Sequence, residues 1–120
     1  MQITVFGIPS CGSVKKARTW LDARGVAHTF VDFRNDPRST EQIEAWVGAL
    51  GSKALRNTSG GSYRALPADK KDWSDARWVQ AFAADPMLIK RPVIEVDGVA
   101  VKAGFRGSDE GIATTLGLGG

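Results

Sequence analysis

A single cysteine, Cys11, stands where a short apolar run ends and a helical pattern begins. The N-terminus of a helix presents unpaired backbone N–H groups and a partial positive charge. Both favour the thiolate, the reactive form of cysteine. Lys15 follows one helical turn later, and Ser13 offers a hydroxyl donor. The pattern indicates a nucleophilic cysteine beside a place where an oxyanion could bind; the alternative is an inert, buried thiol.

The counts of cysteine and histidine exclude other kinds of site. One cysteine cannot form an intramolecular disulfide, so a second thiol must come from another molecule. With one histidine, His28, and no cysteine cluster, the sequence predicts no metal site. We expect His28 to be an ordinary packing or surface residue.

Length and composition predict one globular domain. The chain has 120 residues, of which 42% are apolar and 24% charged. The net charge of +3 is too small for a nucleic-acid-binding face. No apolar run approaches the roughly 18 residues of a membrane helix, and the first residues lack the pattern of a signal peptide. We therefore expect a cytoplasmic monomer without nucleic-acid or membrane partners.

The elements around Cys11 follow from apolar periodicity. Residues 3–6 are rich in β-branched side chains and predict a strand. Residues 11–24 carry apolar side chains at helical spacing, and residues 29–33 predict a second strand. A strand, a helix and a strand in this order imply a parallel pair with a right-handed crossover.

The middle of the chain is predicted to be helical. Ser39 followed by Gln42 is the signature of a capping box, and it opens a helix that runs to Gly51. Residues 52–55 can add a helical turn, and residues 57–62 read as a polar loop. A further helix is expected over residues 75–84, so that a helical insertion occupies about residues 38–86.

The last third predicts a hairpin and a helix. Asp97-Gly98 lies between two β-rich runs, at residues 92–96 and 99–102, and is a strong hairpin signal. A final helix is expected over residues 108–116. The order β-α-β, insertion, β-β-α is the thioredoxin-like arrangement, an α/β fold with a four-stranded mixed sheet. In that fold a cis proline usually precedes the third strand, so we expect a cis Arg91–Pro92 bond.

Three segments of the chain form a recognisable set: GIPSCGSVKKARTWL at residues 7–21, LIKRPV at residues 88–93 and GFR at residues 104–106. They resemble the signatures of the arsenate reductase ArsC/Spx family, and most closely its YffB-type branch. Asn57-Thr58 and the run YRAL at residues 63–66 resemble the family's intervening segment. The similarity covers nearly the whole chain in one order.

The resemblance implies a thioredoxin-like fold and a nucleophilic role for Cys11. In the arsenate reductases the thiolate attacks arsenate, glutathione joins, and glutaredoxin resolves the mixed disulfide, while arginines bind the oxyanion. Arg91 and Arg106 match two of the three arginine positions, and Arg56 lies within about one residue of the third. We expect Ser10, Gly12 and Ser13 to line the substrate site, and Pro92 to shape the edge that binds the thiol.

Two departures from the arsenate reductases favour a different substrate. Their cysteine loop begins His-Asn-Pro, where this chain has Gly7-Ile8-Pro9, and Lys15 stands where they have an arginine. The sequence therefore predicts a glutathione-dependent thiol reductase with glutathione as co-substrate, a glutaredoxin-type partner and no bound cofactor. The alternative is a regulator of the Spx type that binds RNA polymerase. Spx has a Cys-x-x-Cys switch, and here Val14 replaces its second cysteine.

Overall fold

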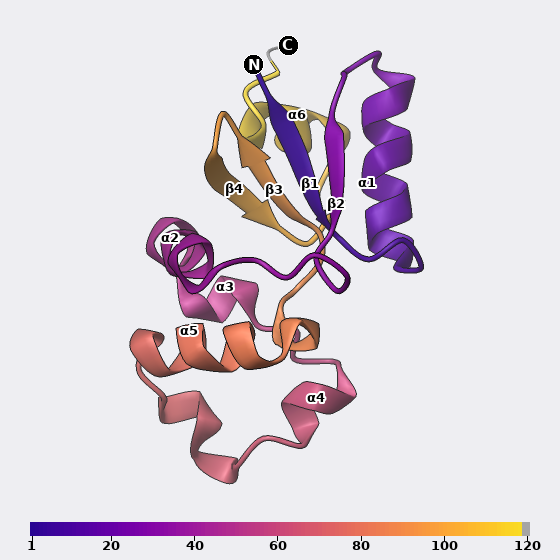
Figure 1. Cartoon of the computed structure of the whole chain (residues 1–120). Helices are drawn as coiled ribbons and strands as arrows, with labels where there is room; N and C mark the ends of the chain where they lie inside the picture. Colours follow the sequence, from indigo (N-terminus) through magenta and orange to yellow (C-terminus); the bar gives the residue numbers. More distant parts are fainter. Residues whose placement is uncertain (119–120) are drawn as a thin grey trace.

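The computed structural model describes residues 1–118, and four strands form its central sheet. The strands are β1 (Ile3–Gly7), β2 (Thr29–Asp32), β3 (Val93–Val96) and β4 (Val99–Ala103), in the order β2-β1-β3-β4. β1 pairs parallel with β2 and antiparallel with β3, and β3 pairs antiparallel with β4. With helices α1 (Gly12–Ala23) and α6 (Asp109–Thr115), this is the predicted thioredoxin-like α/β fold with a mixed sheet (Figure 1).

Helical segments connect β2 to β3. They are α2 (Thr40–Leu50), α3 (Ser52–Leu55), α4 (Gly61–Arg64), α5 (Asp75–Ala84) and the 3-10 turns η1 (Ala68–Asp72) and η2 (Pro86–Leu88). The predicted helices over residues 39–51 and 75–84 are confirmed to within a residue. α4, however, begins inside the predicted polar loop, because a four-residue helix is too short to show apolar periodicity.

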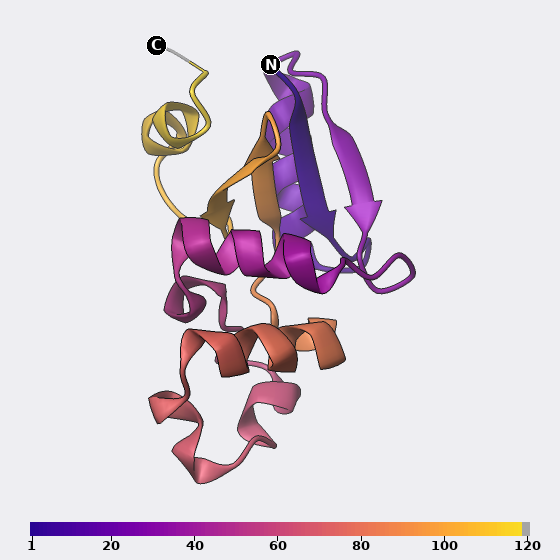
Figure 2. The ribbon, with the colours of Figure 1, turned by 60° about the vertical axis from the view of Figure 1, so that its left-hand side comes forward.

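Successive side chains of a strand point to opposite faces of the sheet, so the apolar ones pack into two separate cores. Ile3 and Val5 of β1 and Ile94 of β3 pack with the apolar faces of α1 and α6. Phe6 of β1 and Val93 of β3 point to the other face, where α2 covers the sheet. α5 packs on the far side of α2, so the layers run α1 and α6, sheet, α2, α5 (Figure 2).

A buried carboxylate joins α2 to the sheet. The Ser39 side chain caps α2 by accepting from the Gln42 amide at 3.1 Å, which is half of the predicted capping box. The side chain of Gln42 does not reach back to Ser39. Instead it donates to Glu95 Oε2 at 3.1 Å, and the indole Nε1 of the buried Trp46 donates to the same oxygen at 2.7 Å. Glu95 on β3 thus fixes α2 on the sheet.

Close contact between β1 and α1 sets the position of Cys11. A Cβ atom on Gly7 would lie 2.5 Å from Val14 Cγ2, so only glycine lets the end of β1 approach α1 this closely. Four residues separate Gly7 from α1, and Cys11 is the N-cap of that helix. A larger residue at position 7 would displace the helix end that carries the thiol.

We predict that Glu95→Leu lowers the free energy of unfolding by about 2 kcal/mol, because it leaves the buried Trp46 Nε1–H without an acceptor. Glu95→Gln keeps an acceptor oxygen and is expected to cost less. Urea denaturation monitored by tryptophan fluorescence measures both values. Equal stability of Glu95→Leu and the unchanged protein would show that this hydrogen bond does not hold α2.

Candidate functional site

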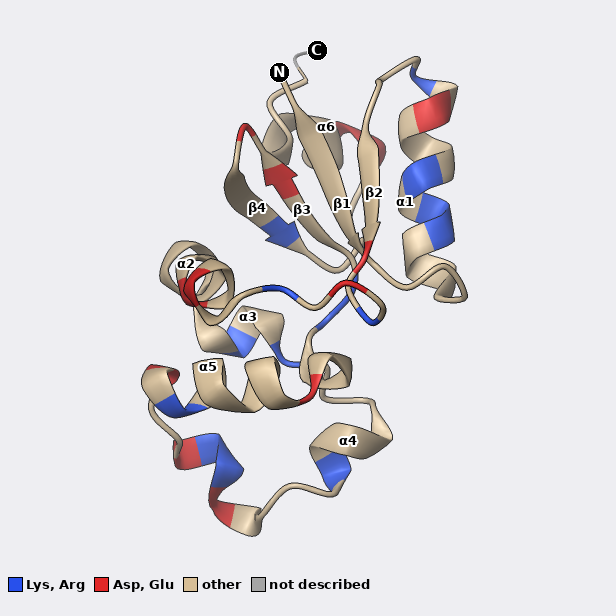
Figure 3. Cartoon of the chain, in the orientation of Figure 1, with Lys and Arg blue, Asp and Glu red and all other residues tan. Residues whose placement is uncertain are grey.

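The sheet topology brings the candidate residues to one edge of the sheet, the end at which β1 and β4 finish and β3 begins. Phe6 at the end of β1 pairs with Val93 at the start of β3, and Val93 pairs with Ala103 at the end of β4. The loop that carries Cys11, the segment Lys90–Pro92 and the segment Gly104–Arg106 therefore all leave the sheet at this edge. Figure 3 colours lysine and arginine positions on α1, before β3 and on β4, and acidic positions at the end of β2 and in the loop after it.

Cys11 is a free, half-buried thiol at the N-cap of α1. Its backbone is extended, and its side chain makes no capping bond. Burial raises the pKa of the Cys11 thiol, but the backbone amides of Val14 and Ser13 and the Arg91 guanidinium stabilise the thiolate, and the net effect lowers the pKa. The donors at the helix N-terminus and one arginine thus outweigh desolvation, which favours a reactive sulfur.

Backbone carbonyls hold the Arg91 guanidinium in place. Its Nη1 donates to the carbonyl oxygens of Met87 and Ile89, both at 3.4 Å, and lies 4.0 Å from Met87 Sδ. Its Nε is buried and has no hydrogen-bond partner among the described residues. The Arg91–Pro92 bond that follows is cis, as expected for this fold. Backbone acceptors thus fix the guanidinium that lowers the pKa of Cys11.

Lys15 is not among the groups that lower the pKa of Cys11. It is exposed and lines a shallow pocket of about 200 Å³ with Pro9, Arg18 and Asp22. Arg91, which lies just before β3, is the cation that lowers the pKa of Cys11. A role for Lys15 in the reaction stays a prediction.

The residues next to Cys11 act mainly through their backbone. Ser13 contributes its amide to the sulfur rather than the expected hydroxyl. Gly12 begins α1 with open space where a side chain would be, and Ser10 is exposed. Pro92 is buried, and its carbonyl oxygen accepts from the Gly104 amide at 2.8 Å, which ties the start of β3 to the end of β4.

The two other predicted arginines lie in different surroundings. Arg106 is exposed after β4, and its carbonyl oxygen accepts from Lys102 Nζ at 2.9 Å. Arg56 ends α3, donates to Ser52 Oγ at 3.0 Å and stacks on the Trp78 ring, 4.4 Å from its centroid. Neither contributes to the pKa of Cys11. Of the three arginines, Arg91 is the one whose guanidinium stabilises the Cys11 thiolate.

Two residues that support Arg91 were missed by the sequence reasoning. Met87 supplies a carbonyl oxygen to Arg91, and Asn57 Nδ2 donates to the same oxygen at 3.3 Å. The Asn57 amide also donates to the Leu88 carbonyl at 2.8 Å. Asn57 appeared in the sequence only as part of a resembling segment, and backbone contacts of this kind leave no pattern of residue types that could have revealed them.

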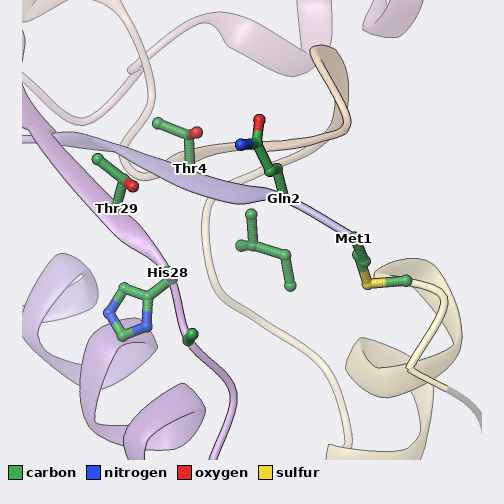
Figure 4. Close-up of a pocket in the computed structure, with 7 residues that line it drawn as sticks. Met1, Gln2, Thr4, His28 and Thr29 are labelled. Atoms are coloured by element: carbon green, nitrogen blue, oxygen red, sulfur yellow. The ribbon is translucent and has the colours of Figure 1, made fainter.

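His28 lies at the opposite end of β1 from Cys11. Its ring Nδ1 donates to the Val26 carbonyl oxygen at 3.1 Å, and it lines a pocket of about 250 Å³ with residues from the starts of β1 and β2 (Figure 4). Within residues 1–118, no group of three or more His, Cys, Asp or Glu side chains could hold a metal ion. No helix in the same range is long and apolar enough to cross a membrane.

Comparison with solved structures supports the fold and the family. A protein named YffB superposes with a TM-score of 0.83 at 33% identity, covering 95% of this chain and 98% of that one. A structure described as a possible arsenate reductase from Streptococcus mutans gives a TM-score of 0.80 at 31% identity, covering 92% of this chain and 96% of that one.

Sequence relatives point the same way. YusI of Bacillus subtilis is 34% identical over 110 residues, which are 88% of this chain and 92% of YusI. The global transcriptional regulator Spx 2 of Lactococcus lactis is 29% identical over 94 residues, 77% of this chain and 71% of the regulator. The model of the ArsC family matches residues 6–111. The chain belongs to the ArsC family.

Proposed function

We propose that this chain is a thiol reductase that uses Cys11 as its only nucleophile and glutathione as co-substrate. The observation that carries the proposal is the half-buried Cys11 thiol, whose pKa is lowered by the amides of Val14 and Ser13 and by Arg91. A thiolate at neutral pH attacks a disulfide sulfur directly. The family and the likeness to a structure described as a possible arsenate reductase agree with this chemistry.

The reaction runs in two exchanges. The Cys11 thiolate attacks the glutathione sulfur of a mixed disulfide, the S–S bond breaks, and the other thiol leaves with the electron pair. A second glutathione then attacks the Cys11–glutathione disulfide and releases oxidised glutathione and the Cys11 thiolate. The proton of the second glutathione ends on the departed thiol. Overall, one mixed disulfide and one free glutathione become one free thiol and one oxidised glutathione.

Positive charge at the sheet edge suits an anionic thiol. Glutathione carries two carboxylates, and arginine pairs with a carboxylate through two parallel hydrogen bonds. Arg91 lies at the sulfur, and Arg106 leaves the sheet at the same edge. Arsenate calls for several donors closing on one small anion, whereas Arg91 is the one side chain among the groups that lower the pKa of Cys11.

A regulator that binds RNA polymerase is the second candidate function. The match to Spx 2 favours it. Val14 replaces the second cysteine of the Spx switch, so this role would have to be independent of an internal disulfide. Co-purification of the chain with RNA polymerase, retained in a Cys11→Ser variant, would support this second function and count against the reductase.

We predict that Cys11 is alkylated with a midpoint below the value of about 8.5 for free cysteine. Arg91→Gln should raise this midpoint and slow alkylation at pH 7 by roughly threefold or more, because the thiolate fraction sets the rate. Lys15→Gln is the matched control and should change the rate less. The rate of iodoacetamide alkylation against pH measures all three. A larger effect of Lys15→Gln than of Arg91→Gln would show that Lys15, and not Arg91, is the main cation that stabilises the thiolate.

We predict that Cys11 forms a mixed disulfide with glutathione more readily than the chain reduces arsenate. Mass spectrometry after incubation with oxidised glutathione detects the adduct, and a coupled assay with glutathione and glutaredoxin follows arsenate reduction; Cys11→Ser is the control for both. Arsenate turnover on the order of 1 per second or faster would contradict the preference. Absence of the adduct would contradict the reductase itself.

A further inference from the structure

Three cations line a pocket on the helical insertion, and Cys11 is not among the residues that line it. The pocket has a volume of about 380 Å³ and is lined by Lys53, Arg56, Thr58, Tyr63 and Lys71. These residues come from α3, the loop after it, α4 and η1, which Figure 3 shows beneath the sheet, with lysine and arginine coloured on α3 and η1. None of the residues that line the pocket is acidic.

Within residues 1–118, no carboxylate forms a salt bridge with these cations. The acid–base pairs of the described chain are Arg38 with Asp36 and His28 with Asp22, so Lys53, Arg56 and Lys71 take no part in them. η1 also carries Asp69 and Asp72 beside Lys71, but Asp69 accepts from Trp73 Nε1 at 3.1 Å, and neither aspartate lines the pocket.

Packing fixes one wall of the pocket. The Arg56 guanidinium is held over the Trp78 ring and by Ser52, and its Nε has no acceptor among the described residues. Tyr63 stacks on Trp78 with ring planes 10° apart, and Lys70 Nζ lies 4.8 Å from the Tyr63 centroid. Arg56 and Tyr63 are therefore pre-positioned on one buried indole, so a ligand need not order them on binding.

We propose that this pocket binds a small organic phosphate. Three positive charges within one concavity repel each other, and a phosphate monoester, with a charge of about −1.5 to −2 at pH 7, offsets them better than a single carboxylate. Lys53 and Lys71 contribute point charges, Arg56 a planar fork of donors, and Thr58 and Tyr63 hydroxyl groups.

The size of the pocket favours an organic ligand over a bare ion. Small-molecule sites have volumes of roughly 300–1,000 Å³, a range that includes this pocket, whereas one water takes up about 30 Å³. The phosphate group would lie among the cations, and the remainder of the molecule would occupy the rest of the space.

Titration of the isotope-labelled, reduced chain with glycerol phosphate tests the site by NMR. We expect saturable shifts of the Thr58, Tyr63 and Lys71 amides that persist in Cys11→Ser, because Cys11 is not among the residues that line the pocket. Lys53→Gln combined with Lys71→Gln should weaken binding by tenfold or more. Acetate and chloride at matched ionic strength should not reproduce the shifts.

A charge-matched control separates a built site from general attraction. Lys16→Gln with Arg24→Gln also removes two charges, one from α1 and one from its C-cap, and should leave the affinity for glycerol phosphate within about twofold. Equal weakening by both double variants, shifts confined to residues around Cys11 and Arg91, or shifts that do not saturate would each overturn the proposal. The glutathione adduct of Cys11 is measured separately, so the two proposals can fail independently.

Discussion

The antiparallel pairing of β1 with β3 is the constraint on which the rest of the site depends. It places the loop after Phe6 beside the segment before Val93, and so brings Cys11 and Arg91 together although 79 positions of the sequence separate them. Glu95 on the same β3 strand holds α2 through Trp46, and Gly7 lets α1 approach the end of β1. One strand pair thus positions the thiol, the cation beside it and the helix that covers the opposite face.

Two opposing effects decide the state of the sulfur. Partial burial disfavours the thiolate, while two backbone amides and one guanidinium favour it, and the donors prevail. The amides cost no reorganisation because the helix already fixes them. Arg91 is fixed as well, since the carbonyl oxygens of Met87 and Ile89 accept from its Nη1. This support comes from main-chain atoms of η2 and the residue after it, so the helical insertion takes part in shaping the reactive end of the domain.

Local signals in the sequence predicted the helices, the strands and the hairpin turn. The sequence could not predict the features that depend on contacts between residues far apart in the chain. The apolar spacing after Cys11, the Ser39 cap and the Asp97-Gly98 turn are each encoded within a few residues, and each appears in the structure; Asp97 and Gly98 both adopt positive φ values, 51° and 83°. The role predicted for Lys15 rested on spacing along one helix, whereas Arg91, which lowers the pKa of Cys11, lies far along the chain, just before β3. Gln42 likewise donates to Glu95 on β3 and not back to Ser39, a contact that no local pattern encodes.

The central claim is that fixed donors outweigh burial at Cys11. The most direct test is the ¹³Cβ chemical shift of Cys11, followed by NMR across a pH titration of the reduced, unmodified chain, because this shift reports the protonation of the sulfur without any reagent. The account predicts a single titration with a midpoint below the free-cysteine value of about 8.5. A midpoint at or above that value would show that desolvation dominates, and that Arg91 and the helix amides do not stabilise a thiolate.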